Sequence, residues 1–388
     1  MPVFVGCYTS QIRVKQLHAK LEDMLFSTEK LLASAAVQGL CEYPEKELEE
    51  AQHALLVSQF HDTLPGTTIE PVEKSTLHTL GRGMDILSNV RNRGFMAMIA
   101  GEDKAGVGEI PLFFYNPHPY PVEGDFSCEF MLEDQNWSSA FRYAVDVVQE
   151  GRPLPTQEEK EYSSLTLDWR KRVVFHATLK PSGITRFECV LRKESWPEKK
   201  KLNYDKAPIV IKAKNTYVEI STVTGLVDCY QVDGKDRLTP GALATVVLED
   251  TPDPWYMTDR KYECGRFHLM TSEETSEFLG APENTVPPVR IIEDGTVRTV
   301  VEAIFRWKHS VLVQTYRISK STGELELEQN LHWHERDKIA KLEVPTAIYD
   351  GTFLGQGMFG VENLEQDETE CVSQQWCGKF NANHAVTI

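Results

Sequence analysis

The chain has 388 residues, of which 41% are hydrophobic and 26% are charged, and its formal net charge at pH 7 is -17. This composition is ordinary for a globular protein of two or three domains. The acidic balance argues against a nucleic-acid backbone or an anionic membrane as the main partner, and it favours a neutral or cationic small substrate.

The eight cysteines are scattered along the chain and form no C-x-x-C pair, which argues against a zinc finger or a redox motif. In a chain of this length the pattern predicts reduced thiols and a reducing compartment, the cytoplasm. The first residues lack the basic and apolar regions of a signal peptide, and no stretch approaches the ~18 apolar residues of a membrane-spanning helix. The oligomeric state, including a homo-oligomer, is left open.

Three amphipathic segments fill the first hundred residues. Apolar side chains recur every three or four positions in residues 10–39, 44–59 and 71–100, which is the spacing of helices that bury one face. The connections between these segments are short, so the helices are expected to run antiparallel. The sequence therefore predicts a three-helix bundle over residues 1–105.

Beyond residue 108 the apolar period changes from 3.6 to 2. Segments such as 110–115, 185–191 and 325–331 are typical of strands, and turn residues separate them. Many such segments predict a large antiparallel β-sandwich over residues 109–388, and thus a multidomain α+β protein. A lysine-rich loop is expected to divide the sandwich into two lobes near residues 195–205.

The segment 58–68 carries an adjacent histidine and aspartate, His61 and Asp62, where the second predicted helix ends. An imidazole can bind a metal ion, and a carboxylate can bind the metal or a sugar hydroxyl. The alternative is that His61 only complements the negative end of the helix dipole, in which case the pair has no functional role. We expect both side chains to be accessible at one end of the bundle, with Leu55 and Leu56 largely buried.

Three further segments are weaker candidates. His332 and His334 lie two positions apart on a predicted strand, where either a metal pair or a polar outward face fits. The loops 250–255 and 374–376 combine polar and aromatic side chains, which can stack on a sugar ring or pack in a core. The sequence has no Gly-x-Ser-x-Gly motif, no P-loop and no dinucleotide fingerprint.

Taken in order, several segments resemble glycoside hydrolase family 38, the zinc-dependent retaining α-mannosidases. They are Gly6-Cys-Tyr-Thr-Ser-Gln11, Gln59-Phe-His-Asp62 followed by Leu64-Pro-Gly66, Phe114-Tyr-Asn-Pro117, Thr251-Pro-Asp-Pro-Trp255, His332-Trp-His-Glu-Arg336 and Gln375-Trp376. The resemblance implies that residues 1–105 are the family's central bundle and that a galactose-mutarotase-like β region follows. It also implies that His61 is a zinc ligand and that Asp62 contacts the mannose hydroxyls.

That family's catalytic α/β barrel lies N-terminal to the bundle and supplies a His-x-Asp zinc pair and the two catalytic carboxylates. None of the eleven histidines here begins a His-x-Asp sequence, and no barrel pattern precedes the first helix. The resemblance therefore predicts part of an α-mannosidase, with one incomplete zinc site, no catalytic residue and no activity on its own. The expected partners are an α-mannoside or oligosaccharide substrate and the missing N-terminal barrel domain.

Two alternatives from other functional classes remain open on the sequence. The chain could be a non-catalytic carbohydrate-binding or scaffolding protein, in which case sugar binding would survive the loss of the Asp62 carboxylate. It could also be a divergent sandwich enzyme, such as an epimerase or lyase, with a site around His332 and His334.

Overall fold

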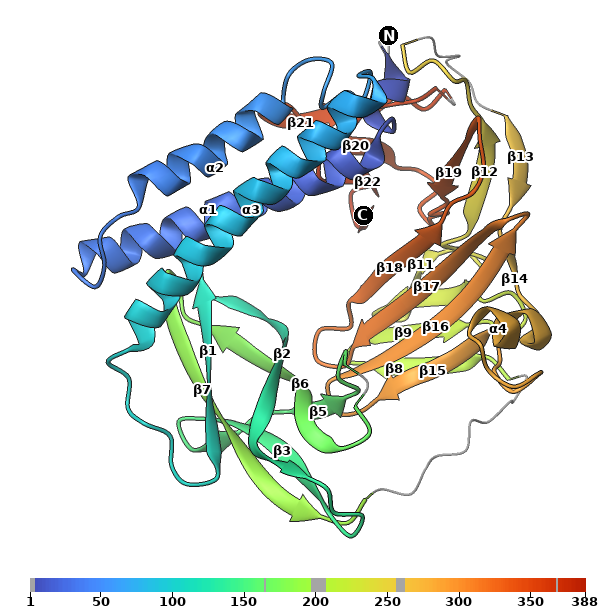
Figure 1. The fold of residues 1–388 in the computed structure, drawn as a ribbon. Helices are drawn as coiled ribbons and strands as arrows, with labels where there is room; N and C mark the ends of the chain where they lie inside the picture. Colours follow the sequence, from blue (N-terminus) through green and yellow to red (C-terminus); the bar gives the residue numbers. More distant parts are fainter. Residues whose placement is uncertain (1–3, 164, 197–206, 256–261, 368) are drawn as a thin grey trace.

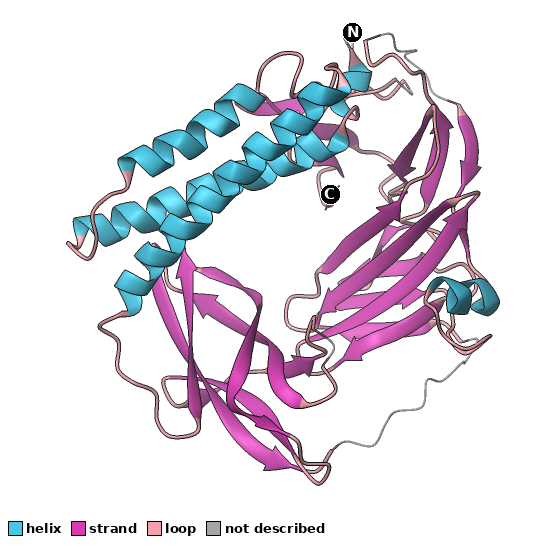
Figure 2. Cartoon of the chain, in the orientation of Figure 1, coloured by secondary structure: helices cyan, strands magenta, loops and turns pink. Residues whose placement is uncertain are grey.

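The computed structural model describes residues 4–163, 165–196, 207–255, 262–367 and 369–388. A short 3-10 helix, Val5–Tyr8, precedes three long helices, α1 (Ile12–Val37), α2 (Glu45–Ser58) and α3 (Glu70–Ile99). Figure 1 shows these helices packed side by side, and antiparallel strands follow from Glu109 onward. The predicted fold class, a helical bundle followed by antiparallel β-sheets, is confirmed, with one additional short helix, α4 (Ser272–Phe278), inside the β region (Figure 2).

The bundle core is built from the apolar stripes that the sequence pattern predicts. Each helix contributes fully buried side chains, such as Leu21 on α1, Ala51 on α2 and Leu87 on α3. Gly39 ends α1 with a positive φ of 72°, so that Leu40 N–H donates to the Ala35 carbonyl at 3.0 Å. This closing turn satisfies a carbonyl that the helix itself leaves free. None of the described helices combines the length and the apolar character that crossing a membrane would require.

The first β unit (residues 109–194) consists of two antiparallel sheets. One sheet has the order β1-β7-β3-β4 and the other β2-β6-β5. Their bounds are β1 (Glu109–Asn116), β2 (Val122–Asn136), β3 (Arg142–Gln149), β4 (Arg152–Pro153), β5 (Thr156–Glu159), β6 (Asp168–Leu179) and β7 (Gly183–Glu194). Phe114 of β1 and Phe187 of β7 meet the ring of Phe175 from β6 at 5.5 and 4.9 Å between centroids, so aromatic contacts join the two sheets.

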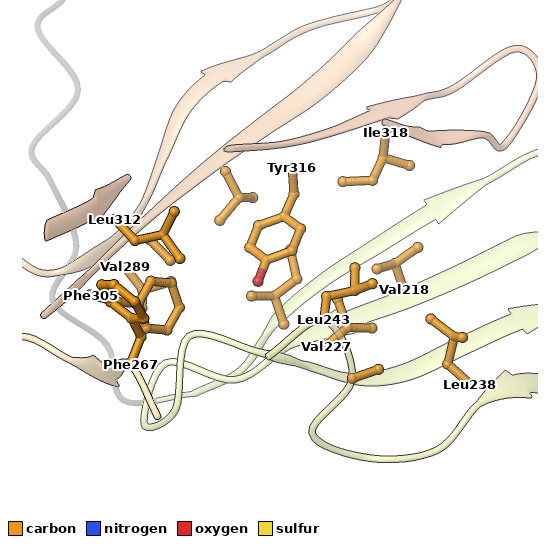
Figure 3. Packing of buried hydrophobic residues seen from close by; sticks show 14 of the residues in the cluster. Val218, Val227, Leu238, Leu243, Phe267, Val289, Phe305, Leu312, Tyr316 and Ile318 are labelled. Atoms are coloured by element: carbon orange, nitrogen blue, oxygen red, sulfur yellow. The ribbon is translucent and has the colours of Figure 1, made fainter. Parts of the chain in front are cut away.

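The second β unit (residues 209–342) contains three antiparallel sheets, ordered β11-β10-β9-β8, β13-β12-β19 and β14-β16-β17-β18, with β15 paired to β16. The bounds of its strands are β8 (Ile209–Ala213), β9 (Thr216–Ile220), β10 (Val227–Val232), β11 (Lys235–Leu238), β12 (Thr245–Glu249), β13 (Glu263–Arg266), β14 (His268–Leu269), β15 (Val289–Asp294), β16 (Arg298–Trp307), β17 (Ser310–Ser319), β18 (Leu325–His332) and β19 (Lys338–Leu342). Its core joins Val218 of β9 to Phe305 of β16 and Tyr316 of β17 (Figure 3).

Tyr316 is the largest fully buried side chain of this core, and its polar end is satisfied. The hydroxyl donates to the Gly225 carbonyl at 2.8 Å and accepts a hydrogen bond from the Gln314 amide. Burial raises the pKa of Tyr316 far above its ordinary value, so the phenol stays neutral. A last antiparallel sheet, β21-β20-β22-β23, is formed by β20 (Thr352–Gly357), β21 (Gly360–Asn363), β22 (Cys377–Phe380) and β23 (Ala385–Thr387).

The two β units are joined where β5 meets the turn before β16. Glu159 accepts two hydrogen bonds from Arg298, each of 2.7 Å, and the side chains of both residues are almost fully buried. Beside this pair, Gln157 Oε1 accepts from the backbone N–H groups of Val297 and Arg298. The contact fixes the second β unit against the first through a charged pair whose donors and acceptors are matched.

The loop expected to divide the β region lies mostly in residues 197–206, which with the lysine run 199–201 fall outside the described residues. Along β18, Leu325 and Leu327 pack on the core, whereas Leu331, the second-last residue of the strand, is exposed.

We expect Gly94 in α3 to be required for close packing of the bundle. A Cβ at this position would lie 2.5 Å from Leu32 Cδ2 and 3.0 Å from Leu31 Cδ2, both buried on α1. Gly94→Ala should therefore lower the free energy of unfolding of the helices by about 1–3 kcal/mol. Gly81 lies on the same helix with open space at its Cβ, so Gly81→Ala should raise it by about 0.5–1 kcal/mol.

Urea unfolding followed by circular dichroism at a helix-specific wavelength measures both glycine effects on the bundle. Equal effects of the two substitutions would contradict the packing of α3 on α1, since only their helix propensity would then matter.

Candidate functional site

The segment that connects α2 to α3 carries His61 and Asp62. Helix α2 ends at Ser58, and His61 and Asp62 follow in a segment of turns between α2 and α3. The turns are closed by backbone hydrogen bonds, of which Thr67 N–H to the Asp62 carbonyl at 3.0 Å is the longest in sequence span. The backbone around the pair is therefore held by its own hydrogen bonds.

The His61 imidazole is open to solvent, and the Asp62 carboxylate is partly covered. Their side chains are 79% and 39% exposed, and His61 Nε2 lies 3.5 Å from Asp62 Oδ2. The other carboxylate oxygen, Oδ1, accepts a hydrogen bond of 3.1 Å from Thr67 Oγ1. The Phe60 ring lies 4.2 Å from the imidazole, centroid to centroid. The carboxylate is thus oriented, while the imidazole keeps free ring edges toward solvent.

The predicted accessibility of the pair agrees with this geometry, but one of the two neighbouring leucines does not. Leu55 is 6% exposed and packs in the bundle core, whereas Leu56 is 54% exposed. Successive residues of a helix are 100° apart, so Leu56 points away from the stripe that contains Leu55. The expectation that Leu56 is buried was wrong.

The start of α1 holds this segment in place through three side chains. Ser10 Oγ donates to the Gly66 carbonyl at 2.6 Å, and Gln11 Nε2 donates to the Thr68 carbonyl at 2.7 Å. Lys15 Nζ donates to the Leu64 carbonyl at 2.8 Å and also to the Ser10 carbonyl. The backbone of the α2–α3 connection is therefore bonded to a helix that precedes it by about 50 residues.

A third segment reaches the same end of the bundle from the second β unit. Cys7 Sγ lies 3.7 Å from the Pro254 carbonyl, as a weak hydrogen bond. Burial raises the pKa of the Cys7 thiol, and the nearby carboxylates of Asp253 and Asp62 raise it further, while Lys15 opposes them. The Cys7 thiol therefore contacts the loop 250–255 and is influenced by the Asp62 carboxylate of the α2–α3 connection. Trp255, the last described residue of this loop, is half exposed.

Lys15 is the functional-site residue that sequence reasoning missed. Lys15 lies outside the apolar stripe of α1, yet its ammonium group is half-buried among backbone carbonyls. Burial lowers the pKa of Lys15 to about 8, and Cys7 acts in the opposite direction. Nothing in the spacing of α1 marks this residue, because its partners are carbonyl groups whose positions depend on the tertiary fold.

A buried histidine lies next to the pair. His18 on α1 accepts a hydrogen bond of 3.2 Å from Gln59 Nε2, and it is 8% exposed. Burial lowers the pKa of His18, which favours its neutral form. It holds Gln59 and the start of the connecting segment against α1.

The other candidate residues are not brought together as a site. His332 ends β18, with its ring 5.8 Å from the Phe278 ring of α4, whereas His334 lies beyond the strand and its N–H donates to Ser310 Oγ. Trp376 contacts Phe380 within the last sheet, at 6.1 Å between ring centroids. Both histidines are exposed, which agrees with a polar outward face.

At the bundle end, His61 and Asp62 are adjacent side chains of the kinds that bind metal ions. Among residues that the structure describes, no three or more His, Cys, Asp or Glu side chains gather where they could hold a metal ion. An imidazole and a carboxylate are nevertheless donors that zinc takes, and a catalytic zinc typically has about three protein ligands. The pair therefore fits part of a zinc site whose further ligands would come from elsewhere.

Two domain families match the chain. The family described as "Alpha mannosidase middle domain" matches residues 3–98, and the "Glycosyl hydrolases family 38 C-terminal domain" matches residues 211–365. Together these ranges cover more than half of the 388 residues. An alpha-mannosidase of Saccharomyces cerevisiae is 39% identical over 71 residues, which are 18% of this chain and 7% of the yeast protein.

Two solved structures from Enterococcus faecalis share the fold. A protein in glycosyl hydrolase family 38 superposes with a TM-score of 0.78 at 13% identity, covering 99% of this chain and 51% of that chain. An alpha-mannosidase of strain V583 superposes with a TM-score of 0.73 at 12% identity, covering 99% and 49%. This chain thus spans about half the length of these relatives, and at such identities the likeness concerns the fold.

We expect Gly66 to be essential for the position of the connecting segment. Its φ is +77°, and a Cβ there would lie 2.5 Å from the backbone oxygen of Ser10, which cannot move without shifting α1. Gly66→Ala should cost about 2–4 kcal/mol of bundle stability, since strain and overpacking add. Gly39→Ala is the matched control, because Gly39 has a φ of +72° but open space around it, and it should cost only about 1 kcal/mol.

Thermal and urea unfolding of the two glycine variants provide this comparison. If Gly66→Ala proved no more costly than Gly39→Ala, the close approach of the segment to Ser10 would be wrong.

We also expect Lys15 to titrate near pH 8. Because its pKa is lower in the folded than in the unfolded state, where it is ~10.4, the unfolded state binds more protons between these values. The contribution of Lys15 to stability should therefore rise as the pH increases from about 8 to about 10. An NMR titration of the Lys15 side chain, assigned with Lys15→Arg, measures the midpoint, with the urea-unfolded chain as control. A folded-state midpoint above 10 would contradict the burial of this ammonium group.

Proposed function

Because this chain belongs to glycosyl hydrolase family 38, we propose that it forms the middle and C-terminal domains of an α-mannosidase. In the complete enzyme these domains take part in the retaining hydrolysis of α-linked mannosides or mannose-containing oligosaccharides. The observation that carries the proposal is that the segments around Cys7, His61 and Pro254 meet at one end of the bundle, although they are far apart in the sequence. The bundle of residues 1–105 and the β region of residues 109–388 are proposed to be separate domains.

His61 is proposed to be one ligand of a catalytic zinc ion. Its exposed ring, with free edges toward solvent, is available to an ion bound jointly with another domain. Bound zinc would orient the hydroxyls of the sugar and stabilise charge on its oxygens. Since one imidazole and one neighbouring carboxylate supply fewer than three ligands, we propose that the remaining ligands come from the catalytic domain.

Asp62 is proposed to bind the mannose hydroxyls next to His61. Thr67 holds one carboxylate oxygen, and the other lies on the side of His61, so the group is oriented before substrate arrives. A charged acceptor that is already oriented binds a sugar hydroxyl at a small entropic cost. Asp62 would therefore position the sugar, without attacking it or protonating the leaving group.

The two catalytic carboxylates are proposed to come from an α/β barrel domain. A retaining glycosidase needs one carboxylate as nucleophile and another as acid/base, about 5–5.5 Å apart. The site segment of this chain offers Asp62 alone for these roles. We therefore propose that residues 1–388 are inactive by themselves and that the barrel completes the site.

Exposed apolar side chains at the same end of the bundle support a docking face for that barrel. They come from the N-terminal turn, the exit of α2 and the start of α3, and are Phe4, Tyr8, Ile12, Leu56, Val57, Phe60, Ile69 and Val72. Large apolar side chains left in water are unfavourable when they gather, and such groups usually mark an interface. Phe60 contacts the His61 ring directly, as expected if another domain covers this end of the bundle.

The cellular location is also proposed. All eight cysteines are free thiols, and several are exposed or half-buried. Thiols of this kind persist in a reducing compartment. We therefore propose a cytoplasmic enzyme.

The test uses a protein that carries the barrel domain together with residues 1–388. We expect it to hydrolyse an aryl α-mannoside and His61→Ala to lower kcat/KM by about 100-fold or more, because a ligand of the catalytic metal is lost. His53→Ala is the matched control, since His53 is exposed on α2 away from the connecting segment, and it should leave the rate unchanged. Residues 1–388 alone should show no turnover with added zinc.

Two outcomes would contradict the proposal in different ways. An extended protein indifferent to His61→Ala would remove the zinc assignment. Turnover by residues 1–388 alone that disappeared in His61→Ala would require two catalytic carboxylates within this chain.

A further inference from the structure

A pocket at the far end of the first β unit has the features of a sugar-binding site. It has a volume of about 390 Å³, which lies within the ~300–1,000 Å³ of small-molecule sites. Its walls come from the loop after β2, from the loop before β6 and from Trp196, which follows β7. Trp137 of the loop after β2 is the second tryptophan in the walls. In Figure 1 the end of β7 lies at the bottom of the molecule, away from the connection between α2 and α3 near the top.

The two indoles are unusually exposed for tryptophan. Trp137 is 74% exposed and Trp196 is 44% exposed, while both line the same pocket. Leaving an indole in water forfeits the burial of its large apolar surface, so exposure needs a reason other than core packing. A pair of indoles in one pocket is such a reason, because their faces can bind an apolar surface of a ligand.

The floor of the pocket is fixed by buried polar groups whose hydrogen bonds are satisfied. Asn136 donates to Asp168 Oδ2 at 3.0 Å and to the Phe141 carbonyl at 3.1 Å, and it accepts from Ser138 N–H. Asp168 is also paired with Lys171, at the buried end of β6. Because these charges are matched with each other, the floor presents no unpaired charge to a ligand.

The same network holds Trp196 in place. Its indole N–H donates to the Ser138 carbonyl at 3.2 Å, which ties the region after β7 to the loop after β2. The rim adds side-chain hydroxyls of Ser139 and Thr166, both exposed. The pocket therefore combines a fixed floor, two aromatic faces and neutral polar groups at its edge.

We propose that this pocket binds a neutral pyranose unit of an oligosaccharide, at a site separate from His61 and Asp62. A pyranose has one face of C–H groups, which stacks on the electron-rich face of an indole, and a rim of hydroxyls, which bond to neutral polar groups. A charged ligand would gain little here, because the Asp168 carboxylate is already paired with Lys171. The proposal does not depend on the proposed glycosidase activity.

The buried state of Asn136 excludes another use of this loop. Asn136-Trp137-Ser138 matches the N-glycosylation sequon, but the Asn136 side chain is buried and both of its amide hydrogens have acceptors. An attached glycan would require this amide to leave the floor of the pocket. The tryptophan of the sequon, and not its asparagine, is the group available to a sugar.

The test is binding of three neutral trisaccharides, α-linked mannotriose, maltotriose and cellotriose, to the whole chain by saturation-transfer NMR and tryptophan fluorescence. At least one should bind with a Kd on the order of 1 mM, the range expected for a small open pocket. Trp137→Ala should weaken this binding at least tenfold, and Ser139→Arg, which fills the pocket from an exposed position, should abolish it.

Two control variants locate the binding. Phe359→Ala removes a fully exposed aromatic ring elsewhere on the surface and should leave the affinity unchanged. Tyr349→Ala removes a second exposed ring, in the segment between β19 and β20, and should also leave it unchanged. Circular dichroism should show all four variants folded, since each changed side chain is exposed. Binding of none of the sugars, binding that Trp137→Ala and Ser139→Arg both leave intact, or binding lost in Tyr349→Ala would each overturn the proposal.

Discussion

The arrangement of this protein depends on the buried pair of Glu159 and Arg298, which joins the two β units. The pair is bidentate, and both side chains are almost fully removed from water. Separating a buried pair generally costs about 3–5 kcal/mol, and without Arg298 the Glu159 carboxylate would keep the more distant guanidinium of Arg172, at 3.6 Å. The neighbouring Gln157 adds acceptors for two backbone N–H groups. Neutral packing between the units would tolerate sliding, whereas this pair has one geometry in which both carboxylate oxygens are satisfied.

The position of one β unit against the other also affects the end of the bundle, because both units contact the helical region. The first β unit follows α3 directly and also touches α1, where Tyr115 and Ser34 share a hydrogen bond of 3.3 Å. The loop that contacts Cys7 belongs to the second β unit, which Arg298 holds against the first. The candidate site therefore lies where the end of the bundle meets a loop of the second β unit. Its geometry is a property of the whole arrangement and not of the bundle alone.

At the bundle end, backbone groups are held tightly while the side chains with metal-binding or sugar-binding chemistry are left accessible. Ser10, Gln11 and Lys15 bond to carbonyls of the connecting segment, and none of them bonds to the His61 ring. The His61 ring is therefore exposed to solvent, while the backbone that carries it is held in a fixed position. Such preorganisation suits a site that is completed by another domain, since little entropy is lost when the remaining ligands arrive.

The sequence by itself determined the helices, most strands and the identity of the His61–Asp62 pair, because periodicity and short motifs are local properties. It could not show that the neighbouring strands β6 and β7 belong to different sheets, since strand partners are chosen by contacts distant in sequence. It likewise gave no sign of Lys15 among carbonyls or of Cys7 beside Pro254. Only the tertiary structure decided these features, because burial and electrostatic environment depend on which distant segments meet a residue.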